Sequence, residues 1–314
     1  MRALRGKRRM IKLLNSKPGA AILLLLLMVI WAFSYIIIKL TVQSGAIPPM
    51  SLAFLRFVVA AAALYALPIR GAAPGREDRG VVALLGVFGM AVYFAFENYG
   101  LVYTTATNAS ILVSMIPAMT MLGAALFLGE KFTPANMAGL AVAFAASVLI
   151  IWNGSANFHL NPVGDLLILL SVISWTAYTL IGHGVMQKYT AALVARQALV
   201  TASLCLAPFF FHELFTGKLA GVTAPALLGV AYLGILCTAL AYTIWGHCVR
   251  VTGPVHASNL LYLQSVITVI CAWFTIREPV NAFLFACMGA LIVGVYLSNA
   301  PAAPRPRMRV PRIK

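Results

Sequence analysis

Apolar segments of membrane-spanning length recur along this chain from residue 20 almost to residue 298, with only short breaks between them. The hydrocarbon core of a bilayer is about 30 Å thick, and a helix of about 20 apolar residues crosses it. Of the 314 residues, 62% are hydrophobic and 10% are charged, whereas an ordinary soluble chain is about 45–50% apolar and about 25% charged. A soluble core could not bury this much apolar surface, so we expect an all-α integral membrane protein.

Glycines, prolines and charged clusters divide the apolar sequence into ten predicted transmembrane helices. Hydrocarbon offers no water to an exposed backbone group, so segments of this length are expected to be helices rather than strands. The first segment is longer than the apolar core of a signal peptide, and we expect it to be retained as a helix. The predicted helices cover residues 20–41, 50–68, 80–102, 106–128, 134–152, 162–182, 190–212, 224–249, 255–276 and 279–298.

The net charge of +16 comes mostly from the two ends of the chain, residues 2–17 and 305–314. With ten helices and a cytoplasmic N-terminus, eighteen of the 23 Lys and Arg residues fall in cytoplasmic segments, two in outer loops and three inside helices. This bias is what the positive-inside rule requires. It predicts a multi-pass protein of the inner membrane with both termini cytoplasmic, and it argues against nucleic acid as the partner of the basic residues.

The two halves of the chain share an order of landmarks. Trp31-Ala-Phe-Ser-Tyr35 in the first predicted helix resembles Trp175-Thr-Ala-Tyr178 in the sixth, and Arg56 and Arg196 stand near the starts of the second and seventh. Five identities at an offset of 148 residues barely exceed chance, so the order of the landmarks carries the prediction. Five helices per half is an odd number, which gives the halves opposite orientations, as in many transporters. The predicted parts are a basic segment 1–18, repeats 19–152 and 153–298, and a basic tail 299–314.

Glu97 stands well inside the third predicted helix, and it shares a helix face with Tyr93 and Gly100. An ionisable side chain in lipid costs a few kcal/mol, so it normally faces a partner or a watery cavity. Two interpretations stay open. Glu97 either binds a proton or an ammonium group during a transport cycle, or it is a hydrogen-bonded acid that holds two helices together.

Three cationic side chains also lie inside predicted helices, namely Lys39, Arg56 and Arg196. The pattern favours arginines that extend to the membrane interface or cap a neighbouring helix. The alternative is that a guanidinium group binds a substrate carboxylate through its paired N–H groups. Lys39 shares a stripe with Trp31 and Tyr35, so it either reaches the interface as well or meets substrate at the outer mouth.

Aromatic and hydroxyl side chains form stripes at spacings of four and three residues on three predicted helices. Such stripes suit a cavity that holds an amphipathic solute by stacking and a few hydrogen bonds. For any single residue, helix packing or anchoring at the interface is the alternative. The stripes are Ser171, Trp175 and Tyr178; Thr238, Tyr242 and Trp245; and Ser258, Tyr262 and Ser265. The predicted cavity lining adds Trp31, Tyr35, Tyr93, Glu97, Asn108 and Asn259 to the residues of these stripes.

No motif for a metal, a cofactor or a nucleotide stands out in the sequence. The histidines lack metal-type spacing, and the five cysteines fall in or beside apolar runs, where small buried thiols are expected. The chain also lacks an HExxH motif, a GxGD motif and a phosphate-binding loop. We therefore expect no cofactor, no direct use of ATP and no enzymatic activity, while a monomer and a homodimer both remain open.

Short motifs occur in a fixed order over nearly the whole chain. They include Trp31-Ala-Phe-Ser-Tyr35 with Lys39, Leu55-Arg56-Phe57, Phe96-Glu97-Asn98-Tyr99-Gly100-Leu101, Leu128-Gly129-Glu130, Gly164-Asp165, Ser174-Trp175, Pro254 and Glu278. In this order they resemble the drug/metabolite transporter superfamily, specifically its ten-helix EamA-type exporters. The resemblance implies a basket of helices, alternating access, and a central cavity lined chiefly by helices 1, 3, 4, 6, 8 and 9. It also implies that helices 5 and 10 lie away from the pathway.

The resemblance implies a secondary transporter that exports small amphipathic metabolites such as amino acids. Its expected partners are a small-molecule substrate, protons as an open coupling ion, and the lipid bilayer. A flippase for a lipid-linked sugar or a lipid is the alternative, and a membrane-embedded enzyme is a more distant one. The substrate and the direction of transport rest on the family alone.

Overall fold

The computed structural model describes residues 15–43, 47–103, 112–152, 161–264, 266–267, 270 and 282–300. Within these ranges all regular secondary structure is helical. Six of the described helices are long and apolar enough to cross a membrane, and three shorter apolar helices accompany them. The expectation of an all-α membrane protein is confirmed.

The helices of the first half follow the predicted segments closely. They are α2 (Lys17–Gln43), α3 (Pro49–Ala66), α4 (Arg79–Gly86), η1 (Val87–Val92), α5 (Tyr93–Tyr103), α7 (Ile116–Phe127) and α8 (Pro134–Trp152). The third predicted helix therefore contains a π-helical segment, η1, between two α-helical parts. The fourth was predicted to start at residue 106, but residues 104–111 lie outside the described ranges.

The second half consists of α9 (Pro162–Lys188), α10 (Ala191–Phe215), α11 (Ala224–Gly234), η2 (Ile235–Leu240), α12 (Ala241–Thr252), α13 (Pro254–Asn259), η3 (Leu260–Tyr262) and α15 (Ala282–Ser298). The predicted end of the sixth helix at residue 182 is wrong, because α9 continues for six residues past the apolar run. Its polar end packs on α12, where His183 Nδ1 lies 3.2 Å from the Val249 carbonyl oxygen and Gln187 donates to that of Arg250.

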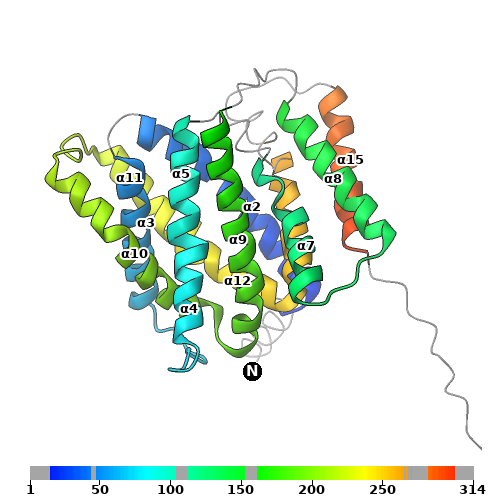
Figure 1. The fold of residues 1–314 in the computed structure, drawn as a ribbon, viewed down its shortest axis with the longest axis horizontal. Helices are drawn as coiled ribbons and strands as arrows, with labels where there is room; N and C mark the ends of the chain where they lie inside the picture. The colour runs from blue at the N-terminus through cyan, green and yellow to red at the C-terminus, as the bar shows by residue number, and fades with distance from the viewer. Residues whose placement is uncertain are drawn as a thin grey trace, which may run out of the picture.

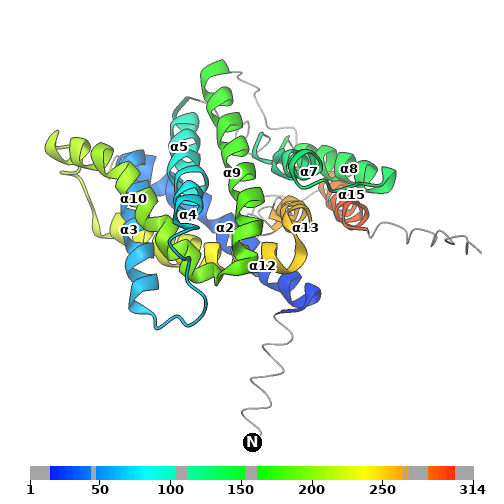
Figure 2. The same cartoon turned by 60° about the horizontal axis from the view of Figure 1, so that its bottom comes forward.

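Pairs of helices from opposite halves pack side by side (Figures 1 and 2). The second and seventh helices, α3 and α10, form one such pair, and the fifth and tenth, α8 and α15, form another. The third helix packs on the sixth through α5 and α9, and the eighth packs on the first through α12 and α2. Exchanging the two halves maps the α3–α10 and α8–α15 pairings onto themselves and the α5–α9 pairing onto that of α12 and α2, as expected for two structurally related repeats.

The two π-helical segments occupy equivalent places in the two halves. Val87 and Ile235 begin them, Val92 and Leu240 end them, and both intervals are 148 residues. This is the offset at which sequence identities recur. A π-helical turn is rare and is frequently found at functional sites, so its occurrence in the third helix of each repeat points to the region between them.

The contact between α8 and α15 is the most extensive one between described elements, and glycines make it close. A Cβ on Gly139 would lie 2.3 Å from the Ser298 backbone nitrogen, and one on Gly294 would lie 2.5 Å from that of Ala143. The Asn136 side chain donates to three backbone carbonyl oxygens at the end of α15 and just beyond it. Backbone contact thus fixes this pair beside the rest of the bundle.

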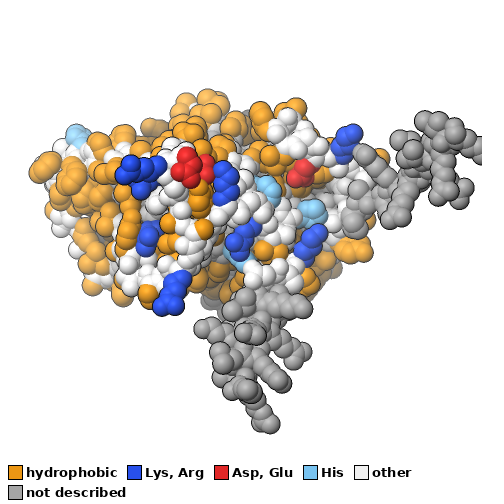
Figure 3. Space-filling view, turned by 90° about the horizontal axis from the view of Figure 1, so that it is seen from below, with side chains coloured by type: hydrophobic (Ala, Val, Ile, Leu, Met, Phe, Trp, Pro, Cys, Tyr) orange, Lys and Arg blue, Asp and Glu red, His pale blue; other side chains and the backbone are white. Residues whose placement is uncertain are grey.

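Basic side chains gather on the face where α4 and α10 begin and α12 ends (Figure 3). There the Lys188 ammonium lies 3.0 Å from an Asp78 carboxylate oxygen, and the Tyr189 hydroxyl donates to the same oxygen over 2.8 Å. The hydrogen bond from Tyr189 and the bond from Lys188 lower the pKa of the Asp78 carboxyl. These contacts tie the α3–α4 loop to the α9–α10 connection, and so join the two repeats at this face.

Candidate functional site

Six aromatic side chains from both repeats meet in the interior and form what we call the aromatic cluster. Its members are Trp31 on α2, Tyr93 on α5, Trp175 and Tyr178 on α9, and Tyr242 and Trp245 on α12. Trp175 lies at its centre, with ring centroids 5.3 Å from Tyr93, 5.4 Å from Trp245 and 5.6 Å from Trp31. Such distances are typical of edge-on aromatic contacts. The aromatic residues of two predicted stripes, on α9 and on α12, therefore meet in the structure.

Backbone carbonyls in the two π-helical segments hold members of the aromatic cluster in place. The Tyr242 hydroxyl donates to the carbonyl oxygen of Gly89 in η1 over 2.7 Å. The Trp31 indole N–H donates to the carbonyl oxygen of Cys237 in η2 over 3.2 Å. A π-helical turn interrupts the regular hydrogen-bond ladder and frees carbonyl groups for such partners. Each segment thus anchors an aromatic residue that belongs to the other repeat.

Two charged side chains lie buried beside the aromatic cluster. Glu97 on α5 is 5% exposed, and one of its oxygens accepts a hydrogen bond of 2.7 Å from the Tyr93 hydroxyl. Arg56 on α3 is 4% exposed, and its Nε donates to the Thr238 hydroxyl over 2.9 Å. The guanidinium carbon of Arg56 lies 4.3 Å from the centroid of the Phe94 ring. Each charge is therefore oriented by a partner of its own.

Other residues of the predicted lining lie away from the aromatic cluster. The Asn259 amide donates to the Asn299 side chain over 3.3 Å near the end of α15, and Tyr262 packs in a separate apolar core with α8 and α15. Ser171 is buried, and its hydroxyl donates to the Ile168 carbonyl one turn earlier. Arg196 lies over the Tyr65 ring, 4.5 Å from its centroid.

Some of the predicted site residues fall outside what the structure describes. The backbone of α2 covers Tyr35 and Lys39, but their side chains are not among the described ones, and Asn108 and Ser265 fall outside entirely. Their proposed contacts with substrate stay predictions.

Sequence reasoning missed Glu213, which caps α3 from another helix. Its carboxylate accepts bonds from the Ser51 backbone N–H over 3.1 Å and from the Ser51 hydroxyl over 2.6 Å. Prolines occupy the start of α3, and no side chain of its own caps it. The predicted end of the seventh helix at residue 212 left Glu213 in a loop, whereas α10 runs to Phe215. The uncapped Pro48-Pro49 start was the signal that a distant acceptor was needed.

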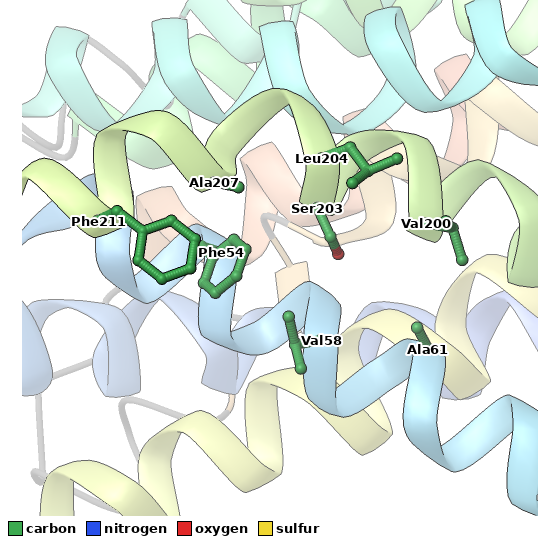
Figure 4. A pocket seen from close by; sticks show the side chains of 8 residues that line it. All are labelled: Phe54, Val58, Ala61, Val200, Ser203, Leu204, Ala207 and Phe211. Carbon is green, nitrogen blue, oxygen red and sulfur yellow. The ribbon is translucent and has the colours of Figure 1, made fainter.

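Two cavities of the described structure lie outside the aromatic cluster. A groove of about 350 Å³ runs between α3 and α10 (Figure 4). Its lining is apolar except for Ser203, whose hydroxyl donates to the Leu199 carbonyl. A second cavity, of about 300 Å³, lies between α2, α10 and α12, where Arg250 donates to His247. The members of the aromatic cluster pack on one another, so the predicted central cavity stays an expectation.

Known proteins resemble this chain over almost its full length. An uncharacterized transporter of Archaeoglobus fulgidus is 32% identical over 296 residues, which are 91% of this chain and 99% of that protein. A probable terminal-alkyne amino-acid exporter of Streptantibioticus cattleyicolor is 29% identical over 90% of this chain and 94% of its own length. A probable amino-acid metabolite efflux pump of Escherichia coli is 23% identical over 91% and 95% of the two chains.

A crystal structure shares the fold, with a TM-score of 0.72 at 18% identity over 90% of this chain and 99% of its own. The family model described as "EamA-like transporter family" matches residues 18–152 and, a second time, residues 162–300. Each match covers one set of five predicted helices, and together they leave little of the chain unmatched. Two matched repeats, paired helices and membrane-spanning apolar segments identify the chain as a member of the EamA-like transporter family, within the drug/metabolite transporter superfamily.

Proposed function

We propose that this protein is a secondary transporter that exports small amphipathic metabolites, amino acids among them, across the inner membrane by alternating access. Both termini are cytoplasmic in this proposal. The observation that carries it is the buried aromatic cluster with Glu97 and Arg56 beside it, built from both repeats. The printed names of two relatives, an amino-acid exporter and an amino-acid metabolite efflux pump, support the substrate class.

Burial of two ionisable groups inside a membrane protein is costly, so it favours a role in transport over one in packing. Apolar side chains would stabilise the same helices without the cost of removing charge from water. The aromatic faces of Trp31, Trp175 and Trp245 suit an apolar or aromatic portion of a solute. The charged groups beside them suit its polar portion.

The hydrogen bonds from the aromatic cluster to η1 and η2 support alternating access. Tyr242 bonds to η1 and Trp31 bonds to η2, and each of these bonds joins elements of different repeats. A movement of one repeat against the other has to break or exchange such bonds, so the site and the movement are coupled. This coupling is the requirement for a carrier that exposes one site to two sides in turn.

The flippase alternative finds little support in the groove between α3 and α10. A lipid-linked sugar needs a polar path for its headgroup that opens toward the bilayer. The groove is lined by side chains such as Phe54, Val58 and Leu204, and no charged residue contributes to it. This groove accommodates hydrocarbon, and the one polar side chain among the described residues that line it, Ser203, already donates to the Leu199 carbonyl.

The test is counterflow in liposomes that contain the purified protein. Candidate substrates are first screened by thermal shift, and radiolabelled amino acids that stabilise the protein are then tested for accumulation against an unlabelled internal pool. We expect counterflow of at least one apolar or aromatic amino acid, reduced at least about tenfold in Trp175→Leu. Tyr296→Leu is the matched control, because Tyr296 is 77% exposed on α15 and its loss leaves the aromatic cluster intact. Absence of counterflow for the whole panel would overturn the proposal.

A further inference from the structure

Glu97 and Arg56 are an acidic and a basic side chain that are both buried and do not pair directly. In the part of the chain that the structure describes, one ion pair brings its nitrogen and oxygen within 4.0 Å, and it joins Lys188 to Asp78 rather than Arg56 to Glu97. A short chain of contacts nevertheless connects Arg56 with Glu97 through two aromatic rings. Arg56 lies over the Phe94 ring, the Phe94 and Tyr93 ring centroids are 4.8 Å apart, and the Tyr93 hydroxyl donates to Glu97.

Each charge is held in its orientation by a separate set of contacts. Thr238 donates to the Leu233 carbonyl and accepts from Arg56 Nε, so its hydroxyl proton is fixed and its oxygen faces the guanidinium group. Phe94 covers one face of that group. These contacts occupy one of the five guanidinium N–H donors. A merely structural pair of counterions would gain most from direct contact, whereas here Arg56 and Glu97 are each bound to a neighbour of their own.

Two donors of the aromatic cluster are buried without an acceptor. The indole N–H groups of Trp175 and Trp245 have no hydrogen-bond partner in the described structure, although these residues are only 5% and 1% exposed. A buried donor left unpaired costs about 1–3 kcal/mol. Two such donors within the aromatic cluster make an environment that a ligand with hydrogen-bond acceptors, such as a carboxylate, would satisfy.

We infer that Arg56 and Glu97 are the two charged ends of a zwitterion site, in which Arg56 binds the carboxylate and Glu97 the ammonium group of an α-amino acid. The side chain of the amino acid lies against Trp31, Trp175 and Trp245. A zwitterion adds no net charge to the membrane interior, whereas an amine or an acid alone adds one. The inference rests on the proposed function and adds which side chains bind the two charged groups of the substrate.

The experiment compares three probes that share a phenyl ring, namely L-phenylalanine, phenethylamine and 3-phenylpropionate. Their inhibition constants for counterflow are measured on the wild type and on Arg56→Gln and Glu97→Gln. For the wild type we expect each singly charged probe to bind about 10- to 100-fold more weakly than phenylalanine, the value of one charged hydrogen-bonding contact. In Arg56→Gln the ratio of the inhibition constant of phenethylamine to that of phenylalanine falls to about one. The corresponding ratio for 3-phenylpropionate is unchanged. Glu97→Gln gives the reciprocal result.

Controls separate recognition from folding. Arg196→Gln removes the same charge from a helix outside the cluster and is expected to keep both preferences. Should Arg56→Gln not insert or fold, Arg56→Lys takes its place, with an expected fall of the same preference because ammonium lacks the paired N–H geometry. A uniform loss for all three probes, or unchanged preferences, overturns the zwitterion site and leaves the proposed exporter standing. If the wild type transports no amino acid, both the zwitterion site and the proposed export of amino acids are overturned.

Discussion

The aromatic cluster and the α8–α15 pair are held together in opposite ways. In the cluster, side chains of one repeat donate to backbone carbonyls in the π-helical segments of the other, as Tyr242 does to Gly89. In the α8–α15 pair, Gly139 and Gly294 bring the backbones themselves into contact. Hydrogen bonds made by side chains can be exchanged by rotation about a few bonds, whereas interlocked backbones cannot. For the alternating-access cycle proposed above, we therefore expect the movement to be centred on the cluster and α8 and α15 to move as one body.

A bulky residue at the glycine contact is expected to have the largest effect. In Gly139→Leu the new Cβ meets the backbone of Ser298 at 2.3 Å, so the two helices must separate. We expect destabilisation of at least about 3 kcal/mol, seen as loss of folded protein in size-exclusion chromatography and a lower melting temperature. Gly289→Ala on the partner helix α15 is the control, because nothing lies within 4 Å of its added methyl group. Equal melting of wild type and Gly139→Leu would contradict the interlocked contact.

Removal of one hydroxyl group tests whether side-chain hydrogen bonds hold the aromatic cluster to the π-helical segments. Tyr242→Phe leaves the Gly89 carbonyl in η1 without its described donor, and the cost of a buried unpaired group is about 1–3 kcal/mol. We expect a lower melting temperature together with slower counterflow. Tyr262→Phe is the matched change, because the Tyr262 hydroxyl is buried without a partner in the described structure, and its removal should leave melting unchanged or raise it. If both variants behave alike, the bond to η1 does not anchor the cluster.

A substitution of Glu213, which caps α3, should have a smaller effect on stability. In Glu213→Gln the side chain still accepts from Ser51, but the bonds lose the charge on the acceptor and the interaction with the positive end of the helix. We expect a loss of about 1 kcal/mol in thermal or denaturant unfolding. Glu77→Gln is the reference and should melt like the wild type, because Glu77 is exposed and a glutamine oxygen can still accept the 3.3 Å bond from the Tyr189 hydroxyl. A Glu213→Gln protein as stable as this reference would show that the cap is not needed.

The smallest effect is expected at the ion pair of Asp78 and Lys188. The pKa of Asp78 is lowered by Tyr189 and Lys188, so the contribution to stability is complete above the ordinary aspartate pKa of about 4 and is lost as the pH falls through the lowered value. Melting of the wild type and of Asp78→Asn should differ slightly at pH 7, and the difference should shrink as the pH falls below about 4 and be lost below the lowered pKa of Asp78. A difference that grows on acidification would contradict this assignment.

Local sequence patterns predicted the helices well and their irregularities poorly. The fifth predicted helix agrees with α8 at both ends, because its apolar run is bounded by proline and by a polar loop. The π-helical segments were not predicted, since one extra residue in a turn leaves no mark in the apolar pattern. The end of α9 was placed too early, because its last turns are stabilised by contacts with α12 rather than by lipid.

The sequence predicted correctly that aromatic residues form the candidate site, but only some of the residues it named lie there. Trp31, Trp175, Tyr242 and Trp245 stood out as aromatic residues at helical spacing, and the structure brings them together. Asn259 and Tyr262 followed the same pattern but lie beside α8 and α15. Spacing along a helix shows which residues share a face, but it does not show which neighbour that face meets.

The sequence by itself determined that this chain spans a membrane repeatedly, that it has two related halves and that it belongs to a transporter family. Transfer of a segment into lipid depends on its own twenty or so residues, so it can be read locally. The tertiary structure alone decided that Trp31 bonds to η2, 206 residues away, and that Ser51 bonds to Glu213, 162 residues away. It also decided that Arg56 packs on Phe94 and bonds to Thr238 while Glu97 bonds to Tyr93, instead of the two forming an ion pair. Such contacts depend on how distant helices pack, and no local pattern encodes that.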